Sequence, residues 1–320
     1  MSADFISLLK KVPMRLYQLF MLLVFWTAEA QTTAILDAEN KQAIPYATVV
    51  FKKEGKPVDG FYTSENGILE LPSSEYDTAE ISSLGYENKS VARHDIKAQL
   101  YLKPKAIELA EVIVSSAKDT LIGEYNFKKA KSQPIGTGHQ LAVFIDNPAG
   151  RDVPLKALWL KLAKIKYTTV VRIYLCERKD YVQEYIEAGG ETGSYESYIP
   201  AEALTAQNII TELKPENGND AKIDLAKYEL VLPKDGAFIV MEIIGHYNTL
   251  NQNVVKPAVK DITAIEVHKA VNDNYCQRLG ITNLFWVNTN RWLRNDYEYM
   301  GSKPPRNTFV TPTMGVVIGI

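Results

Sequence analysis

A run of aromatic and polar residues near the carboxyl end carries the chemistry that we consider first. Residues 285–299 read FWVNTNRWLRNDYEY. Sugars bind to β-sandwich lectins by stacking on exposed aromatic rings, while amide and charged groups take the sugar hydroxyls. The side chains that we expect to contact a ligand are Trp292, Tyr297, Tyr299, Asn290, Arg294 and Asn295. The alternative is packing, and Trp286, in a continuous apolar run, is expected to lie in the core.

Pairs of carboxylates offer an enzymatic alternative. Glu184 with Glu187, or Asp296 with Glu298, could flank a glycosidic bond. A glycosidase needs a set separation between two carboxyl groups and surroundings that move their pKa values apart. The sequence shows neither property, and solvated side chains on strands explain these residues more simply. An envelope hydrolase whose site is built from scattered carboxylates is therefore the alternative function.

Established catalytic and metal-binding patterns are absent from the sequence. Its four histidines are His94, His139, His246 and His268, and none begins an H-x-x-E or H-E-x-x-H zinc pattern. No G-x-S-x-G elbow, P-loop or G-x-G-x-x-G fingerprint occurs. His268 and Cys276 could in principle form a catalytic thiol–imidazole pair, but their spacing along the chain does not indicate that they are in contact. We therefore predict no catalytic residue, no metal and no cofactor, and expect a protein that works by binding.

The amino-terminal segment has the three parts of a secretory signal. Basic residues precede an apolar run at 16–27, and Ala28-Glu29-Ala30 follows as a cleavage site. The run is shorter than the roughly 20 residues of a membrane-spanning helix. We therefore expect a signal peptide over 1–30 and no transmembrane span after its removal. Translation could begin at Met1 or at Met14, because Met14 and Arg15 before the apolar run make a compact signal by themselves.

The overall charge argues against nucleic acid as a partner. The 320 residues carry a formal net charge of -2, and the sequence has no long basic run. A broad field that would attract nucleic acid or anionic lipid is therefore not expected. Hydrophobic residues make up 46% of the chain and charged residues 23%, which is the balance of a soluble globular protein.

The sequence contains two cysteines, Cys176 and Cys276, which could form a disulfide or remain as thiols. An exported protein meets oxidising conditions, so a disulfide between them would form if their strands meet. The alternative is two separate buried thiols. The apolar strand VVRIYLC that ends at Cys176 favours burial.

Short strands between turns fill residues 31–104. We expect strands at 32–36, 47–51, 60–63, 68–71, 81–84 and 99–102, with another around Val91. Asn66-Gly67 is a strong signal for a hairpin turn, since both residues tolerate positive φ. This many strands in so short a segment, without helical periodicity, predict a small β-sandwich.

Four blocks in this segment resemble the carboxypeptidase regulatory-like domain, a transthyretin-like sandwich. In order they are I35-x-D37, IPYATV at 44–49, TSENGILEL at 63–71 and ISSLGYE at 81–87. Thr33, Ser64 and Leu69 depart from the family pattern without removing a strand. The segment LAEVIV at 109–114 is similar to one that often follows this domain in TonB-dependent outer-membrane receptors. The resemblance implies a periplasmic or outer-membrane-associated protein of a Gram-negative bacterium, and it implies no peptidase activity.

A linker is expected over 105–135 and a second β domain over 136–320. In the second domain, strands are expected at 140–145, 155–165, 168–176, 209–213, 228–232, 238–244, 284–287 and 316–320. Ala201–Ala206 is the one short helix that the pattern suggests. Strands separated by long loops predict a two-sheet jelly roll. The order of these segments also resembles a poorly characterised carboxyl-terminal region found behind the regulatory-like domain in envelope proteins.

Together these patterns predict an all-β protein, with a small transthyretin-like β-sandwich followed by a larger jelly-roll-like β-sandwich. The predicted function is that of a non-catalytic binding or accessory protein of the cell envelope. Its expected partner is a glycan or an outer-membrane receptor protein.

Overall fold

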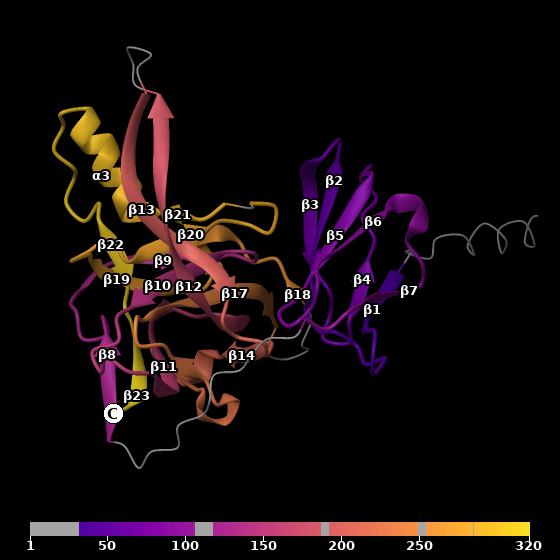
Figure 1. The fold of residues 1–320 in the computed structure, drawn as a ribbon, viewed down its shortest axis with the longest axis horizontal. Helices are drawn as coiled ribbons and strands as arrows, with labels where there is room; N and C mark the ends of the chain where they lie inside the picture. Colours follow the sequence, from indigo (N-terminus) through magenta and orange to yellow (C-terminus); the bar gives the residue numbers. More distant parts are fainter. Residues whose placement is uncertain (1–31, 106–117, 187–191, 249–253, 284) are drawn as a thin grey trace, which may run out of the picture.

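The chain folds into two domains built of β-strands. The computed structural model describes residues 32–105, 118–186, 192–248, 254–283 and 285–320. A smaller domain precedes residue 106 and a larger one follows residue 117, and the two lie side by side (Figure 1). Strands dominate both domains, so the predicted all-β sandwich fold is confirmed. The predicted signal peptide at 1–30 lies outside the described residues.

Two sheets form a sandwich in the smaller domain. One has the strand order β4-β1-β7 and the other β3-β2-β5-β6. The elements are β1 (Thr32–Asp37), β2 (Thr48–Lys53), β3 (Lys56–Tyr62), β4 (Ile68–Glu70), β5 (Thr78–Ser82), β6 (Lys89–Ala92), the 3-10 turn η1 (Arg93–Asp95) and β7 (Gln99–Leu102). Inward-facing side chains such as Ile35, Phe51, Ile81 and Leu102 are buried between the sheets, as the alternation of a half-buried strand requires.

Two sheets also pack face to face in the larger domain. The first has the order β13-β12-β17-β10-β20-β21, with β14 beside β12 and β18 beside β17. Its strands are β10 (Gln140–Ile145), β12 (Thr168–Ile186), β13 (Thr192–Ala203), β14 (Ile209–Leu213), β17 (Ala237–Tyr247), β18 (Val254–Val255), β20 (Tyr275–Arg278) and β21 (Val287–Asn288). The outer halves of β12 and β13 extend beyond the sheet as a long hairpin (Figure 1).

The second sheet of the larger domain has the order β22-β19-β11-β23-β8. Strands β15 and β16 also pair with β11, and β9 pairs with β19. The strands are β8 (Asp119–Gly123), β9 (Lys129–Pro134), β11 (Val153–Lys164), β15 (Asp220–Asp224), β16 (Val231–Leu232), β19 (Ala264–Lys269), β22 (Val310–Pro312) and β23 (Met314–Gly319). Short 3-10 turns are η2 (Pro215–Asn217), η3 (Ala226–Tyr228) and η4 (Val259–Asp261), and α3 (Thr289–Tyr299) is an α-helix.

The core of the larger domain lies between these sheets, as the sequence alternation predicts. Leu158, Leu160 and Leu162 of β11 are fully buried, whereas Trp159 and Lys161 between them are partly exposed. The leucines meet aliphatic side chains of the opposite sheet in one continuous cluster. Each fully buried leucine contributes about 1.5–3 kcal/mol to folding, so this cluster supplies the main driving force for the domain.

The linker predicted over 105–135 is too long. Residues 119–123 form β8, which pairs with β23, and residues 129–134 form β9, which pairs with β19. These strands belong to the second sheet of the larger domain. Both strands lie at sheet edges, where most of their side chains face water. They therefore contain few apolar residues, and the sequence pattern did not indicate strands there.

Two other local predictions, a helix at 201–206 and a hairpin at Asn66-Gly67, differ from the structure. Ala201–Ala203 ends strand β13 instead of starting the predicted helix, since β13 must reach back to pair with Cys176 of β12. The Asn66-Gly67 turn forms, with Gly67 at φ +69 and a hypothetical Cβ only 2.8 Å from the Ile35 carbonyl. It joins strands of different sheets, however, because β4 pairs with β1 and not with β3.

The disulfide considered for Cys176 and Cys276 is not formed. Both residues are free, buried thiols. Cys176 lies on β12 and Cys276 on β20, and β17 and β10 separate these strands in the sheet. The two strands are thus three strand spacings apart, at about 4.8 Å each. That distance is longer than the roughly 7 Å between Cα atoms that a disulfide can bridge. Burial raises the pKa of the Cys176 thiol to about 12.

A buried ion pair ties the two domains together. Arg172 of β12 donates to Glu242 of β17 over 2.6 Å, and each side chain is 3% exposed. The same guanidinium donates to the main-chain carbonyl of Tyr46 in the smaller domain. From that domain, the Tyr62 hydroxyl donates to Glu242 over 2.8 Å. The smaller domain therefore completes the hydrogen bonding of charges that the larger domain supplies.

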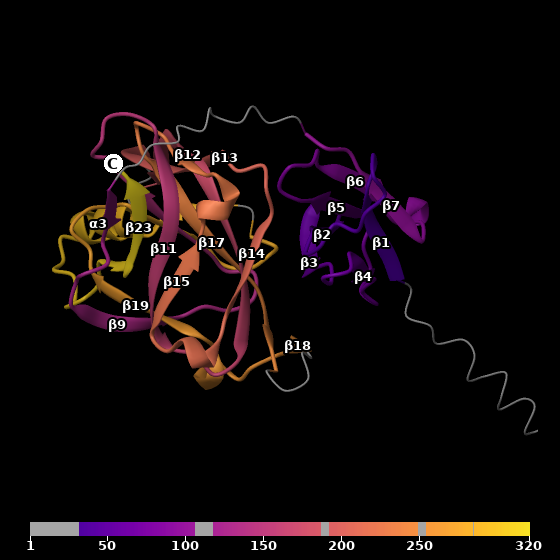
Figure 2. The ribbon, with the colours of Figure 1, turned by 90° about the horizontal axis from the view of Figure 1, so that it is seen from below.

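Apolar contacts and a close backbone approach surround this ion pair. Tyr46 packs with Val170 and Ile244 of the larger domain. Gly85 of the smaller domain lies so close to the larger one that a Cβ would be 2.5 Å from the Ala206 carbonyl oxygen. Figure 2 shows the smaller domain against the β14 side of the larger one. The contacts between the domains are thus both polar and tightly packed.

Candidate ligand-binding cleft

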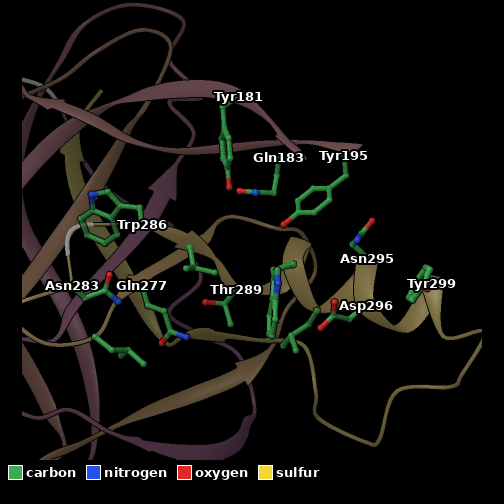
Figure 3. A pocket seen from close by; sticks show the side chains of 14 residues that line it. Tyr181, Gln183, Tyr195, Gln277, Asn283, Trp286, Thr289, Asn295, Asp296 and Tyr299 are labelled. Atoms are coloured by element: carbon green, nitrogen blue, oxygen red, sulfur yellow. The ribbon is translucent and has the colours of Figure 1, made fainter. Parts of the chain in front are cut away.

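A cleft of about 750 Å³ lies between the β12–β13 hairpin and helix α3 (Figure 3). The rest of its lining comes from β20, β21 and the loop between them. Its aromatic side chains are Tyr181, Tyr195, Trp286, Trp292 and Tyr299. Its polar side chains are Gln183, Gln277, Asn283, Thr289, Asn295 and Asp296. Ring faces and hydrogen-bonding groups therefore converge on one hollow.

Helix α3 forms one wall of the cleft, and the residue before it caps its first turn. The Asn288 side chain accepts a hydrogen bond from the Arg291 main-chain N–H over 3.2 Å, which satisfies a donor that the first turn leaves unpaired. Residues three, four and seven positions apart share one helix face. Trp292, Asp296 and Tyr299 follow this spacing, and all three line the cleft.

Two of the predicted ligand contacts, Trp292 and Tyr299, are thus in the cleft, and so is Asn295. The Trp292 side chain is 47% exposed and the Tyr299 side chain 46%. These values leave about half of each side chain accessible to a ligand.

Asn290 was predicted as a ligand contact and is instead fully buried. Its side-chain Nδ2 donates to the Val310 carbonyl over 3.0 Å, and its Oδ1 accepts from the Val310 N–H over 3.1 Å. The amide therefore pairs with β22 as a neighbouring strand would. The prediction was wrong because the helix turns Asn290 toward the protein.

Arg294 and Tyr297 also lie outside the cleft lining. The Arg294 Nε donates to Asp273 over 2.8 Å, and its guanidinium lies 4.3 Å from the centre of the Phe309 ring. The Tyr297 ring meets the same phenylalanine edge-on at 6.4 Å. Both side chains fix α3 to the segment before β22, which is a structural role in place of the predicted one.

The opposite wall is held against α3 through backbone carbonyls of β13. The Asn288 side chain donates to the Tyr198 carbonyl over 3.2 Å, and the Arg291 Nε donates to the Glu196 carbonyl over 3.0 Å. Carbonyls on alternate residues of a strand point the same way, so both belong to the outer edge of β13. These bonds cover part of an edge strand and set the width of the cleft.

Several lining residues were not anticipated from the sequence. Tyr181 and Gln183 stand two residues apart on β12 and so share one face of the hairpin. Tyr195 lies beside Gln183 on the paired strand β13 (Figure 3). Burial raises the pKa of Tyr181, which stays a neutral hydroxyl. The signal that could have found them is the period of two along a strand, which places Tyr181 and Gln183 on one face and Val182 on the other.

Trp286 was expected in the core and instead is half-buried at the end of the cleft. Its inner face packs on a cluster that includes Phe238 and Cys276. The guanidinium of Arg278 lies 5.4 Å from the ring centre. Trp286 lies in the loop between β20 and β21, and its exposed side lines the cleft.

The carboxylate pairs considered for a hydrolase do not meet in the cleft. Asp296 is the single carboxylate among the described lining residues. Glu298 is exposed and stands two positions further on the helix, which places it on another face. Glu184 alternates with the lining residue Gln183 on β12 and is exposed. Glu187 lies outside the described residues.

A histidine, a carboxylate and a hydroxyl meet elsewhere, but inside the protein. His268 contacts Glu124 through Nε2 and lies 3.3 Å from the Thr313 hydroxyl through Nδ1. His268 and Thr313 are at most 1% exposed, and the Phe127 ring stacks on the imidazole at 4.5 Å. The order resembles a nucleophilic triad, yet a substrate cannot reach the hydroxyl. These residues therefore form a buried polar network.

Among the residues that the structure describes, no group of three or more His, Cys, Asp or Glu side chains could hold a metal ion. In the same residues, no helix has the length and apolar character needed to cross a membrane.

Comparisons with known proteins add no family to this picture. No protein-family model matches the chain, and no curated protein matches it.

Proposed function

We propose that the chain is a non-catalytic glycan-binding protein and that the cleft between the β12–β13 hairpin and α3 is its binding site. The observation that carries the proposal is the lining of this cleft, in which five aromatic rings stand among amide, hydroxyl and carboxylate groups. Aromatic rings present apolar faces to the C–H faces of a sugar. The polar groups pair with sugar hydroxyls, which fixes orientation and specificity.

The same lining favours binding over hydrolysis of a glycosidic bond. Both geometries of glycoside hydrolysis use two carboxyl groups across the scissile bond. The described lining offers Asp296 alone. The abundance of amide groups likewise supports a glycan over the outer-membrane protein partner that the sequence also allowed.

Replacing Trp292 tests this proposal directly. Loss of a stacked ring from the centre of a binding site costs 1.4 kcal/mol or more, about tenfold in affinity. We therefore expect glycans found on an array to bind Trp292→Ala at least about tenfold more weakly by calorimetry. Trp159→Ala is the matched control, because Trp159 lies on β11 of the other sheet and outside the cleft lining. Equal affinities of Trp292→Ala and the wild type would place the site elsewhere.

The location that we propose is the cell envelope of a Gram-negative bacterium. It is supported by the signal-like segment at 1–30 and by the resemblance of 31–104 to the carboxypeptidase regulatory-like domain. Fractionation of expressing cells, followed by amino-terminal sequencing of the mature protein, tests both points. The expected mature protein begins at Gln31. A cytoplasmic protein with an intact amino terminus would refute the proposal.

A further inference from the structure

The spacing of the exposed rings on α3 matches a chain of linked sugars. Trp292 and Tyr299 are seven residues apart on one face of the helix. At 1.5 Å per residue, seven residues span about 10.5 Å along the axis, which is on the scale of two linked pyranose rings. A sugar chain lying along α3 would therefore meet the two rings with alternate units.

The cleft is elongated in the same direction. Trp286 stands at one end and Tyr299 at the other, with Thr289 and Asp296 between them (Figure 3). Tyr181 and Gln183 of the hairpin lie across from this row (Figure 3). A volume of about 750 Å³ falls within the range of sites for ligands larger than a single sugar. The shape thus suits several consecutive units.

The charges of the lining select among glycans. Asp296 is the one charged group among the described lining residues. The nearby arginines contact other parts of the protein: Arg291 donates to the Glu196 carbonyl, Arg294 donates to the Asp273 carboxylate, and Arg278 lies against the Trp286 ring. A uronate or sulfated sugar would face a carboxylate with no cation in the lining to neutralise it. The cleft is therefore suited to neutral sugars.

We propose that the cleft binds an internal stretch of a neutral, linear polysaccharide, with Trp292 and Tyr299 stacking on sugars separated by one unit. This inference rests on the proposed glycan-binding function and adds to it the ligand's charge, its linear form and its minimum length of three sugars.

The test is calorimetry of the mature full-length protein with neutral linear oligosaccharides of two to six units. Gluco-, manno-, xylo- and galacto-oligosaccharide series serve as probes, with an oligouronate series as the charged counterpart. For the series that binds, affinity should rise about tenfold between two and four units and then level off. The oligouronates should bind at least tenfold more weakly than neutral chains of equal length.

Two variants separate the roles of the rings. Tyr299→Ala should remove the gain between two and four units and leave disaccharide affinity unchanged. Trp292→Ala should weaken all lengths. Tyr228→Ala, at the partly exposed end of η3 and outside the cleft lining, is the matched control and should change nothing.

The outcomes distinguish this inference from the function on which it rests. Affinity that is independent of length, but still lost in Trp292→Ala, would overturn the extended mode and keep glycan binding. Preferred binding of oligouronates would overturn the assignment of a neutral ligand. Failure of every series to bind would overturn both the inference and the proposed function.

Discussion

The buried ion pair between the domains gives the sharpest prediction about stability. Replacing Arg172 with Met keeps much of its volume and removes its charge. Glu242 would then be a carboxylate at 3% exposure, left with the Tyr62 hydroxyl and the Gln140 amide as donors, each at 2.8 Å. Removing one partner of a buried pair costs about 3–5 kcal/mol, because it leaves an uncompensated charge.

Arg172 also donates to the Tyr46 carbonyl and, over 2.7 Å, to the Asn208 side chain. Both acceptors lose a partner in Arg172→Met, so we expect a loss near the middle of that range, about 4 kcal/mol. For a protein of this size, such a loss lowers the midpoint of thermal unfolding by about 10 °C. Chemical and thermal unfolding, followed by tryptophan fluorescence, measure the two quantities.

The double variant Arg172→Met with Glu242→Gln removes both charges and keeps an acceptor for Tyr62. It should therefore recover about half of the lost stability, because the buried uncompensated charge is gone. Lys103→Met is the control, since the Lys103–Glu87 pair is largely exposed and such pairs contribute at most about 1 kcal/mol. A loss below about 1 kcal/mol in Arg172→Met, or a double variant no more stable than it, would refute the reasoning.

The remaining predictions concern single groups. Tyr62→Phe removes a hydrogen bond to a charged acceptor across the domain interface and should cost about 1.5–3 kcal/mol by denaturant unfolding; an unchanged midpoint would contradict that role. Burial lowers the pKa of His139 and His246 below 6.5, so the unfolded chain binds more protons as the pH falls through that value. Their contribution should be complete above about pH 6.5 and decline below it, and His139→Gln should flatten this dependence in thermal scans from pH 8 to pH 5. Asn290→Ala should lower stability by about 1–3 kcal/mol, because it leaves two backbone groups of β22 unpaired, while glycan affinity measured on the folded fraction is retained. Burial raises the pKa of Cys176 to about 12 and that of Cys276 above its usual range, so thiol reagents should label neither residue at pH 8 until the protein is unfolded.

Strands whose side chains alternate between core and water were predictable from the sequence. Residues 140–145 and 99–102 coincide with β10 and β7, and the leucines of β11 are buried as the alternation indicates. Edge strands such as β8 and β9 were not, since few of their side chains enter the core. Their position depends on partners that lie far away along the chain, which no local pattern reports.

The candidate site shows a similar division. Trp292 and Tyr299 were identified from composition, but the helix that carries them was not. The Asn288 cap, together with apolar or aromatic residues four apart at 293 and 297 and seven apart at 292 and 299, would have favoured α3. Asn290 differs from Asn295 only by its position around that helix. Composition can therefore nominate a segment, while the turn of the helix decides which side chains reach the ligand.

The position of β23 has a consequence for the order of events during synthesis. This strand, Met314–Gly319, lies between β11 and β8 in the sheet. A nascent chain that has not reached these residues leaves the long strand β11 without one neighbour and β8 without its partner. Contacts between such distant segments make folding slow and keep unpaired edges exposed meanwhile. The second sheet can therefore close only after nearly the whole larger domain has been made, so this domain stays incompletely folded while the chain is being elongated.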